Sequence, residues 1–268
     1  MLALAAALAT AALLPGFTPA APGPAGGQVL RGTFPGTFRP GLVYLPPGFD
    51  PTARCPVVYL LHGMPGSPDE YVDGAALADF ADPGIADGRL RPFIAVVPAA
   101  GTSRDYNGEW AGQWENAVVN LVPWVDKHLP TIPTRSARVL AGLSAGGFGA
   151  VDIGLRHLDL FGTIESWSGY FDPLHDGPFK DASRVDLAEH DPTSLVRGER
   201  RLLDRYPTRF YLSTGPLHSH WAKPSQTVAF GDELRGLGLR FTLRVFRDKK
   251  GEWRSQLDDG LSVALGGP

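Results

Sequence analysis

The sequence is poor in the residues that build disulfide and metal frameworks. Its 268 residues include a single cysteine, Cys55, so no disulfide can form within the chain. Cys55 precedes Pro56 at the start of an apolar run, which is typical of a buried and inert thiol. No group of cysteines and histidines has zinc-ligand spacing, and neither a glycine-rich phosphate loop nor an internal repeat is present. The sequence therefore predicts no metal site.

The chain also lacks an excess of charge of either sign. Twenty-five basic residues stand against 28 acidic ones, which gives a net charge of −3. Without a basic field, binding to nucleic acid or to an anionic membrane surface is not expected. The 43% of hydrophobic and 20% of charged residues are ordinary for a globular protein, and the length fits one large α/β domain.

The apolar run near the start of the chain is too short to cross a bilayer. It extends from Leu2 to Leu14 and matches the apolar core of a secretory signal, with small residues at 18–21 as a cleavage site. A wrongly chosen start codon that leaves the tail of a membrane segment is the alternative. Residues 19–27 are Pro, Ala and Gly without periodicity, which is typical of a flexible linker. We therefore expect a leader and linker at 1–27, one folded domain at 28–268, and a protein that is secreted or held at the cell envelope.

From about residue 28, short β-branched runs alternate with longer stretches of helical periodicity. Strands are expected at 43–45, 56–61, 93–97, 138–141, 162–167, 209–213 and 240–246. Helices are expected at 69–80, 114–129, 146–157, 193–204, 225–237 and 253–265. This alternation predicts an α/β fold with a mostly parallel central sheet and helices on both faces. Functional side chains are then expected at the carboxyl ends of the strands.

A nucleophile motif stands between one of these strands and the helix that follows it. Residues 142–146 read Gly-Leu-Ser-Ala-Gly, which matches G-x-S-x-G, and a strand-to-helix turn would present the Ser144 hydroxyl above the sheet. The alternative is a structural turn whose serine only caps the helix, but a cap does not explain the glycines on both sides. Ser144 is therefore predicted to be the nucleophile.

Such a serine needs two N–H donors to hold the oxyanion that forms when it attacks a carbonyl group. The loop after the buried strand at 56–61 begins with His62, Gly63 and Met64. We expect the backbone N–H groups of Met64 and Ala145 to form this oxyanion hole. His62 is expected to orient the loop and border the substrate rather than to act as the base.

Several segments together resemble the esterase D superfamily, particularly the branch with actinobacterial secreted esterases and mycolyltransferases. They are YLLHG at 59–63, GQWE at 112–115, PWVDKHLP at 123–130, AGLSAGGFGA at 141–150, SGYFDP at 168–173 and W-R-x-Q-L-x-x-G-L at 253–261. The resemblance covers about residues 40–265. It implies the α/β-hydrolase fold, acyl transfer to water or a sugar hydroxyl through a serine acyl-enzyme, and no cofactor.

The partners of the serine depart from the pattern of that superfamily. There, the acid follows the strand equivalent to 209–213, and the histidine follows the next strand. In this sequence the first of these loops carries His218 and His220 instead of a carboxylate, and the second carries Asp248 but no histidine.

Two interpretations remain open. In the first, the roles have exchanged loops, so that one of the two histidines is the base and Asp248 or Glu252 orients it, because a triad is defined by geometry rather than by chain order. His175 is a reserve base and Glu115 a reserve acid. In the second, catalysis is weak or lost, and the protein binds glycolipid or sugar at the cell envelope.

Three tryptophans follow strands on the side where the site is expected. Burial in the core is the usual fate of such residues. The loop positions of Trp110, Trp114 and Trp167 also suit the walls of an acyl or glycan pocket, so they are candidate substrate-binding residues.

The leading hypothesis is a serine carboxylic-ester hydrolase or acyltransferase. Its substrate would be a small-molecule, lipid or sugar ester, with possible association with the cell envelope. A peptidase on the same fold is a weaker alternative that peptide-substrate profiling would separate.

Overall fold

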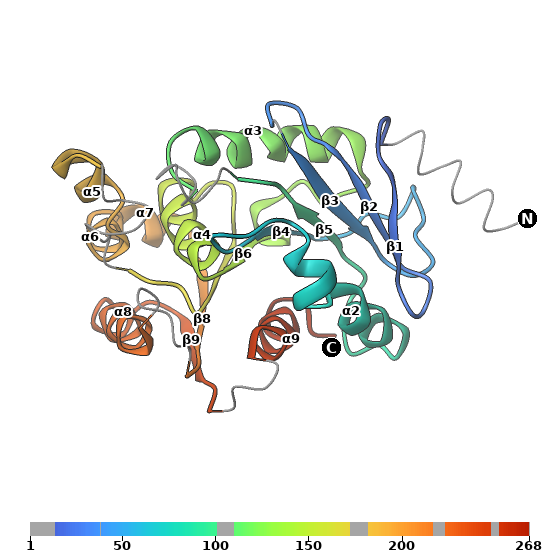
Figure 1. Ribbon diagram of the computed structural model, residues 1–268. Helices are drawn as coiled ribbons and strands as arrows, with labels where there is room; N and C mark the ends of the chain where they lie inside the picture. Colours follow the sequence, from blue (N-terminus) through green and yellow to red (C-terminus); the bar gives the residue numbers. More distant parts are fainter. Residues whose placement is uncertain are drawn as a thin grey trace, which may run out of the picture.

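The computed structural model describes residues 14–37, 39–100, 110–171, 182–216, 223–247 and 252–267. Within these ranges the chain forms a nine-stranded sheet in the order β1-β2-β3-β5-β4-β6-β7-β8-β9 (Figure 1). The strands are β1 (Thr18–Pro22), β2 (Gln28–Thr33), β3 (Pro40–Leu45), β4 (Val57–Leu61), β5 (Ile94–Val97), β6 (Arg138–Leu143), β7 (Thr163–Trp167), β8 (Arg209–Thr214) and β9 (Phe241–Val245).

The sheet is antiparallel at one end and parallel over the rest. Strands β1, β2 and β3 pair antiparallel, as does β3 with β5, and every further pair from β5 to β9 is parallel. All residues of β4, β5, β6 and β7 are buried. Parallel strands covered on both faces need apolar side chains on both, which is why these runs do not alternate with polar residues. The predicted mostly parallel α/β sheet is confirmed.

Helices cover both faces of the sheet (Figure 1). They are η1 (Glu70–Gly74, a π-helical turn), α2 (Leu77–Ala86), α3 (Gln113–His128), η3 (Arg135–Ala137), α4 (Ala145–Arg156), α5 (Arg184–Glu189), α6 (Pro192–Gly198), α7 (Arg200–Arg205), α8 (Pro224–Gly236) and α9 (Glu252–Leu265). Val57, Tyr59 and Leu61 of β4 pack in the cluster that includes α3, whereas Val58 and Leu60 pack in the cluster that includes α2 and α9. Successive strand residues thus feed two cores, as the two-residue period of a strand requires. No helix in the described ranges has both the length and the apolar character to cross a membrane.

The expected linker at 19–27 is wrong for its first residues, because β1 begins at Thr18 and pairs with β2. Its prolines are tolerated because β1 is an edge strand. The buried carboxylate of Asp82 in α2 holds the turn between the two strands by accepting hydrogen bonds from the N–H groups of Ala25 (3.0 Å) and Gly27 (2.8 Å). Residues 1–13 of the predicted leader lie outside the described residues.

Two predicted helices are each divided into two. The expected helix at 69–80 is the turn η1 followed by α2, because Ala76 between them has a φ of 52° and reverses the chain. The expected helix at 193–204 is α6 followed by α7, and the two helices meet at Glu199. Helix α5 was not predicted.

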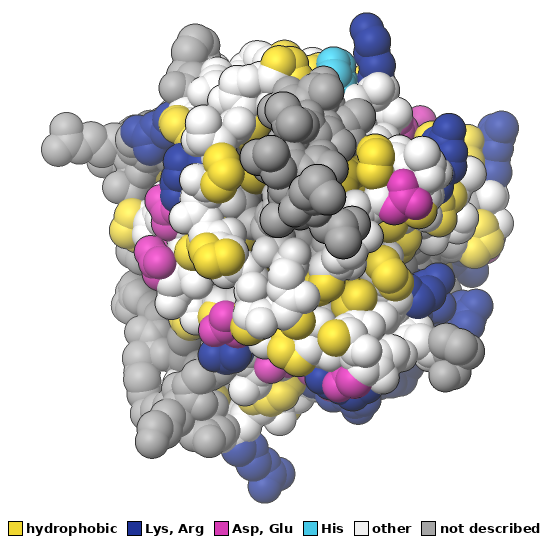
Figure 2. Space-filling view, turned by 90° about the vertical axis from the view of Figure 1, so that its right-hand side faces the viewer, with side chains coloured by type: hydrophobic (Ala, Val, Ile, Leu, Met, Phe, Trp, Pro, Cys, Tyr) yellow, Lys and Arg dark blue, Asp and Glu magenta, His cyan; other side chains and the backbone are white. Residues whose placement is uncertain are grey.

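Figure 2 shows the face at the β1 end of the sheet, where acidic and basic side chains are interspersed.

Candidate active site

Ser144 lies in a sharp turn between β6 and α4. It has φ 50° and ψ −113°, it is the residue before the first turn of the helix, and its side chain is partly exposed. A non-glycine residue with this positive φ is strained, and such strain concentrates at functional sites. The Ser144 N–H donates to the Trp167 carbonyl over 2.9 Å, which ties the turn to β7. The observed geometry is the strand–turn–helix arrangement of a nucleophile elbow.

Gly146, two residues after the serine, is required because the backbone of α4 passes close to the backbone at the end of β4. A Cβ atom at Gly146 would lie 1.9 Å from the carbonyl oxygen of Leu61, the last residue of β4. Only a residue without a side chain lets the start of α4 come this near to the neighbouring strand. The motif glycine therefore packs the elbow against the loop that leaves β4.

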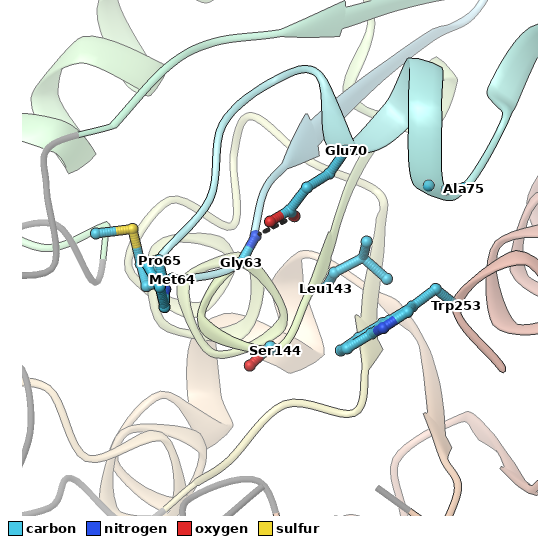
Figure 3. Close-up of a pocket in the computed structure, with 9 residues that line it drawn as sticks. Gly63, Met64, Pro65, Glu70, Ala75, Leu143, Ser144 and Trp253 are labelled. Carbon is cyan, nitrogen blue, oxygen red and sulfur yellow. Dashed lines mark hydrogen bonds between the residues drawn. The ribbon is translucent and has the colours of Figure 1, made fainter. Parts of the chain in front are cut away.

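That loop runs directly beside the serine. A Cβ atom at Gly63 would lie 3.5 Å from the Cβ of Ser144. Met64 and Ser144 border one cavity of about 240 Å³ (Figure 3). Its walls are residues 63–65 of the loop, Glu70, Gly74 and Ala75, Leu143 and Ser144, and Trp253 of α9. Ala145 is the first residue of α4. The roles of the Met64 and Ala145 N–H groups as oxyanion donors stay predictions, on a loop and a helix start that do flank Ser144.

Glu70 is a functional candidate that the sequence did not reveal. Its carboxylate points toward the loop, where Oε2 accepts a 2.9 Å hydrogen bond from the Gly63 N–H (Figure 3). Burial raises the pKa of Glu70, and the Gly63 N–H opposes that rise by stabilising the charged form. Trp253 was also missed as a cavity residue, although it begins a recognised motif.

His62 orients the loop, as expected, and cannot be the base. Its Nε2 accepts from the Ala100 N–H over 3.0 Å, and its Nδ1 lies 2.8 Å from the Gly63 carbonyl oxygen, to which it donates. Burial lowers the pKa of His62 to about 4, so the ring is neutral at neutral pH. Only 1% of the surface of His62 is exposed, so the ring has a structural role. The prediction that His62 borders the substrate is not supported.

The three candidate indoles are packed in the core. Trp110 and Trp114 belong to the cluster under α3, and Trp167 belongs to the opposite one. The Trp110 Nε1–H donates to the His62 carbonyl over 3.0 Å, and the Trp167 Nε1–H donates to Glu165 over 3.1 Å. Their burial assigns them to packing, so the prediction that they wall a substrate pocket is not supported.

Three other described histidines are bound away from the elbow. His128 ends α3 and lies 2.8 Å through Nδ1 from the carbonyl oxygen of the preceding turn. His157 lies just past α4, at the end far from the serine, and contacts Glu115 over 2.8 Å. His190 contacts the buried carboxylate of Asp152 over 2.7 Å. Glu115, the reserve acid, is therefore committed to a contact outside the site.

The predicted base and acid lie outside the described residues. These are His218 and His220 after β8, Asp248 after β9, and the reserve base His175. Since the described histidines are engaged elsewhere, a histidine that serves Ser144 must be one of these three.

A buried polar cluster supports the edge of the sheet where these loops begin. The Ser213 hydroxyl at the end of β8 donates to Gln256 Oε1 over 2.7 Å, and the Gln256 Nε2 donates to the Ser168 hydroxyl over 2.9 Å. Ser168, just after β7, also has a positive φ of 51°. The cluster joins β7 and β8 to α9. No group of three or more His, Cys, Asp or Glu side chains in the described ranges could hold a metal ion.

Curated relatives of this chain include esterases. A two-activity protein of Xylanibacter ruminicola, named endo-1,4-beta-xylanase/feruloyl esterase, is 33% identical over 138 residues, which is 47% of this chain and 19% of that protein. An esterase of Mycobacterium tuberculosis is 31% identical over 141 residues, which is 49% of this chain and 29% of that protein. The chain thus spans less than a third of the length of these relatives.

Solved structures share the fold over most of the chain. A ferulic acid esterase has a TM-score of 0.74 at 24% identity and covers 89% of this chain and 98% of its own. An S-formylglutathione hydrolase from Agrobacterium tumefaciens has a TM-score of 0.71 at 17% identity and covers 94% of this chain and 100% of its own. These likenesses confirm the predicted α/β-hydrolase fold.

A family model described as putative esterase matches residues 35–236, which include the elbow, the loop at 62–64 and most of the sheet. This match spans well over half of the chain and agrees with the esterase resemblance of the motifs. The chain belongs to the putative esterase family.

Proposed function

We propose that this protein hydrolyses carboxylic esters through an acyl-enzyme on Ser144. The observation that carries the proposal is the strained backbone of Ser144, which has a φ of 50° and lies immediately before α4. Ser144 also borders a cavity together with Gly63 and Met64. Family membership and the esterase names of its relatives support the reaction class.

The chemistry follows from the parts in place. The Ser144 hydroxyl attacks the ester carbonyl while a histidine takes its proton, and the N–H groups of Met64 and Ala145 hold the oxyanion. The attack forms a tetrahedral intermediate. Its collapse breaks the bond to the alcohol, which leaves with the proton from the histidine. Water then attacks the acyl-enzyme by the same steps, releasing the acid and restoring the serine. The proposed base is His218 or His220, oriented by Asp248.

The cavity favours a compact acyl group. Its volume of about 240 Å³ exceeds the roughly 150 Å³ of a cavity that admits benzene, so an aromatic or short acyl group fits. A sugar hydroxyl in place of water as the acceptor would make the protein an acyltransferase, which is the second candidate reaction. We further propose export to the cell exterior or envelope, on the apolar run at residues 2–14.

The experiment compares wild type with Ser144→Ala on p-nitrophenyl esters of increasing acyl length. Wild type should turn over the short esters, and the variant should lose at least about 10³-fold in kcat, because nothing replaces the nucleophile. A labelled fluorophosphonate should react with wild type at Ser144 only. The matched control is Ser136→Ala, an exposed serine at the opposite end of β6, which should keep full activity. Wild type that neither reacts with the probe nor hydrolyses any ester would exclude an ester hydrolase.

A further inference from the structure

The first two residues of η1 hold the start of the oxyanion loop, and the residue before them anchors η1 to the sheet. The Tyr71 hydroxyl donates to the Leu61 carbonyl over 2.8 Å, and the Glu70 carboxylate accepts from the Gly63 N–H over 2.9 Å. Asp69 pairs with Arg31 of β2, which anchors the turn to the sheet. The chain is therefore held three residues before Met64, at Leu61, and one residue before it, at Gly63.

The carboxylate of Glu70 is half-buried, and the loop that it holds passes close to both of its oxygens. A Cβ atom at Gly66 would lie 1.9 Å from Glu70 Oε1, so this second glycine lets the chain close over the other oxygen. A Cβ atom at Gly63 would be 3.5 Å from Glu70 Oε2 and 3.5 Å from the Ser144 Cβ. Glu70 Oε2 and the Cβ of Ser144 are therefore separated by at most twice 3.5 Å. Both residues border the same cavity.

A contact of this kind is needed because glycine does not fix its own backbone. Gly63 has no side chain to restrict φ and ψ, and the peptide that it shares with Met64 carries one of the two expected oxyanion donors. Donors stabilise a transition state only when they are held in place before the reaction. A carboxylate close to a developing oxyanion is electrostatically unfavourable, so its presence indicates a positioning role that outweighs the repulsion.

We propose that Glu70 is the positioning residue of the oxyanion hole, acting through its hydrogen bond from the Gly63 N–H. The proposal rests on the proposed ester hydrolysis at Ser144. It assigns to the turn η1 the task of setting the position of the Met64 donor.

The test compares Glu70→Ala with Glu70→Gln, because an amide oxygen can still accept from Gly63. Glu70→Ala should lower kcat for a short p-nitrophenyl ester by about 10- to 100-fold, with KM changed by less than about threefold, since the lost contact acts on the transition state. Glu70→Gln should stay within about threefold of wild type in kcat. Asp73→Ala removes an exposed carboxylate from the same turn and should change neither constant.

A second measurement tests the contact without turnover. Hydrogen exchange of the Gly63 amide should be slow in wild type and in Glu70→Gln, and fast in Glu70→Ala. Unchanged kcat in Glu70→Ala, or a Gln variant as slow as the Ala variant, would overturn the proposal. If wild type turns over no ester, the proposed hydrolysis fails independently of the role of Glu70. The amide exchange then tests the contact between Glu70 and Gly63: equal exchange of the Gly63 amide in all three proteins would refute it, and the expected pattern would support it.

Discussion

Glu165 lies in the middle of strand β7 and should make the protein less stable as the pH rises. This residue of β7 is fully buried against α9, where its Oε2 accepts from Trp167 and its Oε1 has no hydrogen-bond partner among the described residues. Burial raises the pKa of Glu165 to about 8, and the nearby Asp259 adds to the rise. The folded protein therefore keeps the proton at neutral pH.

The magnitude follows from the difference between the folded and unfolded pKa values. The unfolded chain releases the proton above its usual pKa of 4.5, whereas the folded protein holds it up to about 8. Between these values the folded state binds more protons, so stability is greatest below pH 4.5 and falls as pH rises, by up to about 1.4 kcal/mol per pH unit. From pH 5.5 to 7.5, this single group should lower the free energy of unfolding by about 2.5 kcal/mol, because the folded group begins to lose its proton near the upper end of that range.

Glu165→Gln removes the titration and keeps an oxygen that accepts from Trp167. Urea unfolding of wild type and variant between pH 5.5 and 7.5 should give curves that diverge, with the variant gaining relative stability at the higher pH. The control is Glu189→Gln, an exposed carboxylate on α5 whose removal should leave the pH dependence parallel to wild type. Parallel curves for wild type and Glu165→Gln would show that the buried carboxyl is not held protonated.

Two further predictions concern close contacts. Asp82→Ala leaves the buried hydroxyl of Tyr44 and two backbone N–H groups without their acceptor, so urea unfolding should show a loss of about 3 kcal/mol or more; a loss under about 1 kcal/mol would contradict this assignment. Gly146→Ala places a methyl group against the Leu61 carbonyl and should lower kcat/KM for ester hydrolysis by at least about 100-fold. The control is Gly236→Ala, where an added Cβ meets no described atom within 4 Å and kcat/KM should not change. Equal activity in the two variants would refute the role of Gly146.

The sequence was sufficient where a local pattern determines the structure. The apolar run of β4 and the G-x-S-x-G motif depend on neighbouring residues, so both could be located without the fold. Strand β1 could not, because its Pro- and Ala-rich segment has no strand pattern, and the turn after it depends on Asp82, which is 55 residues away from Gly27 in the chain. The split of the expected helix at 69–80 likewise depends on a single residue with positive φ, Ala76.

The side chains of the site were harder to predict than its backbone. The position of a tryptophan along the chain does not say on which side of the sheet edge its ring lies. Trp110 and Trp167 turned into the core, whereas Trp253, on a helix remote in sequence, borders the cavity. Glu70 had no signature at all, because its importance comes from one hydrogen bond across a loop.

The left-handed backbone at the edge of the sheet has an evolutionary consequence. Trp110, Ser144 and Ser168 all have positive φ, a conformation that is common for glycine and uncommon for tryptophan and serine. A mutation of Ser144 to glycine would relax the turn while removing the nucleophile, so selection for folding alone would favour an inert protein. The strain at Ser144 is thus a cost in stability that accompanies the position of its hydroxyl group beside the cavity.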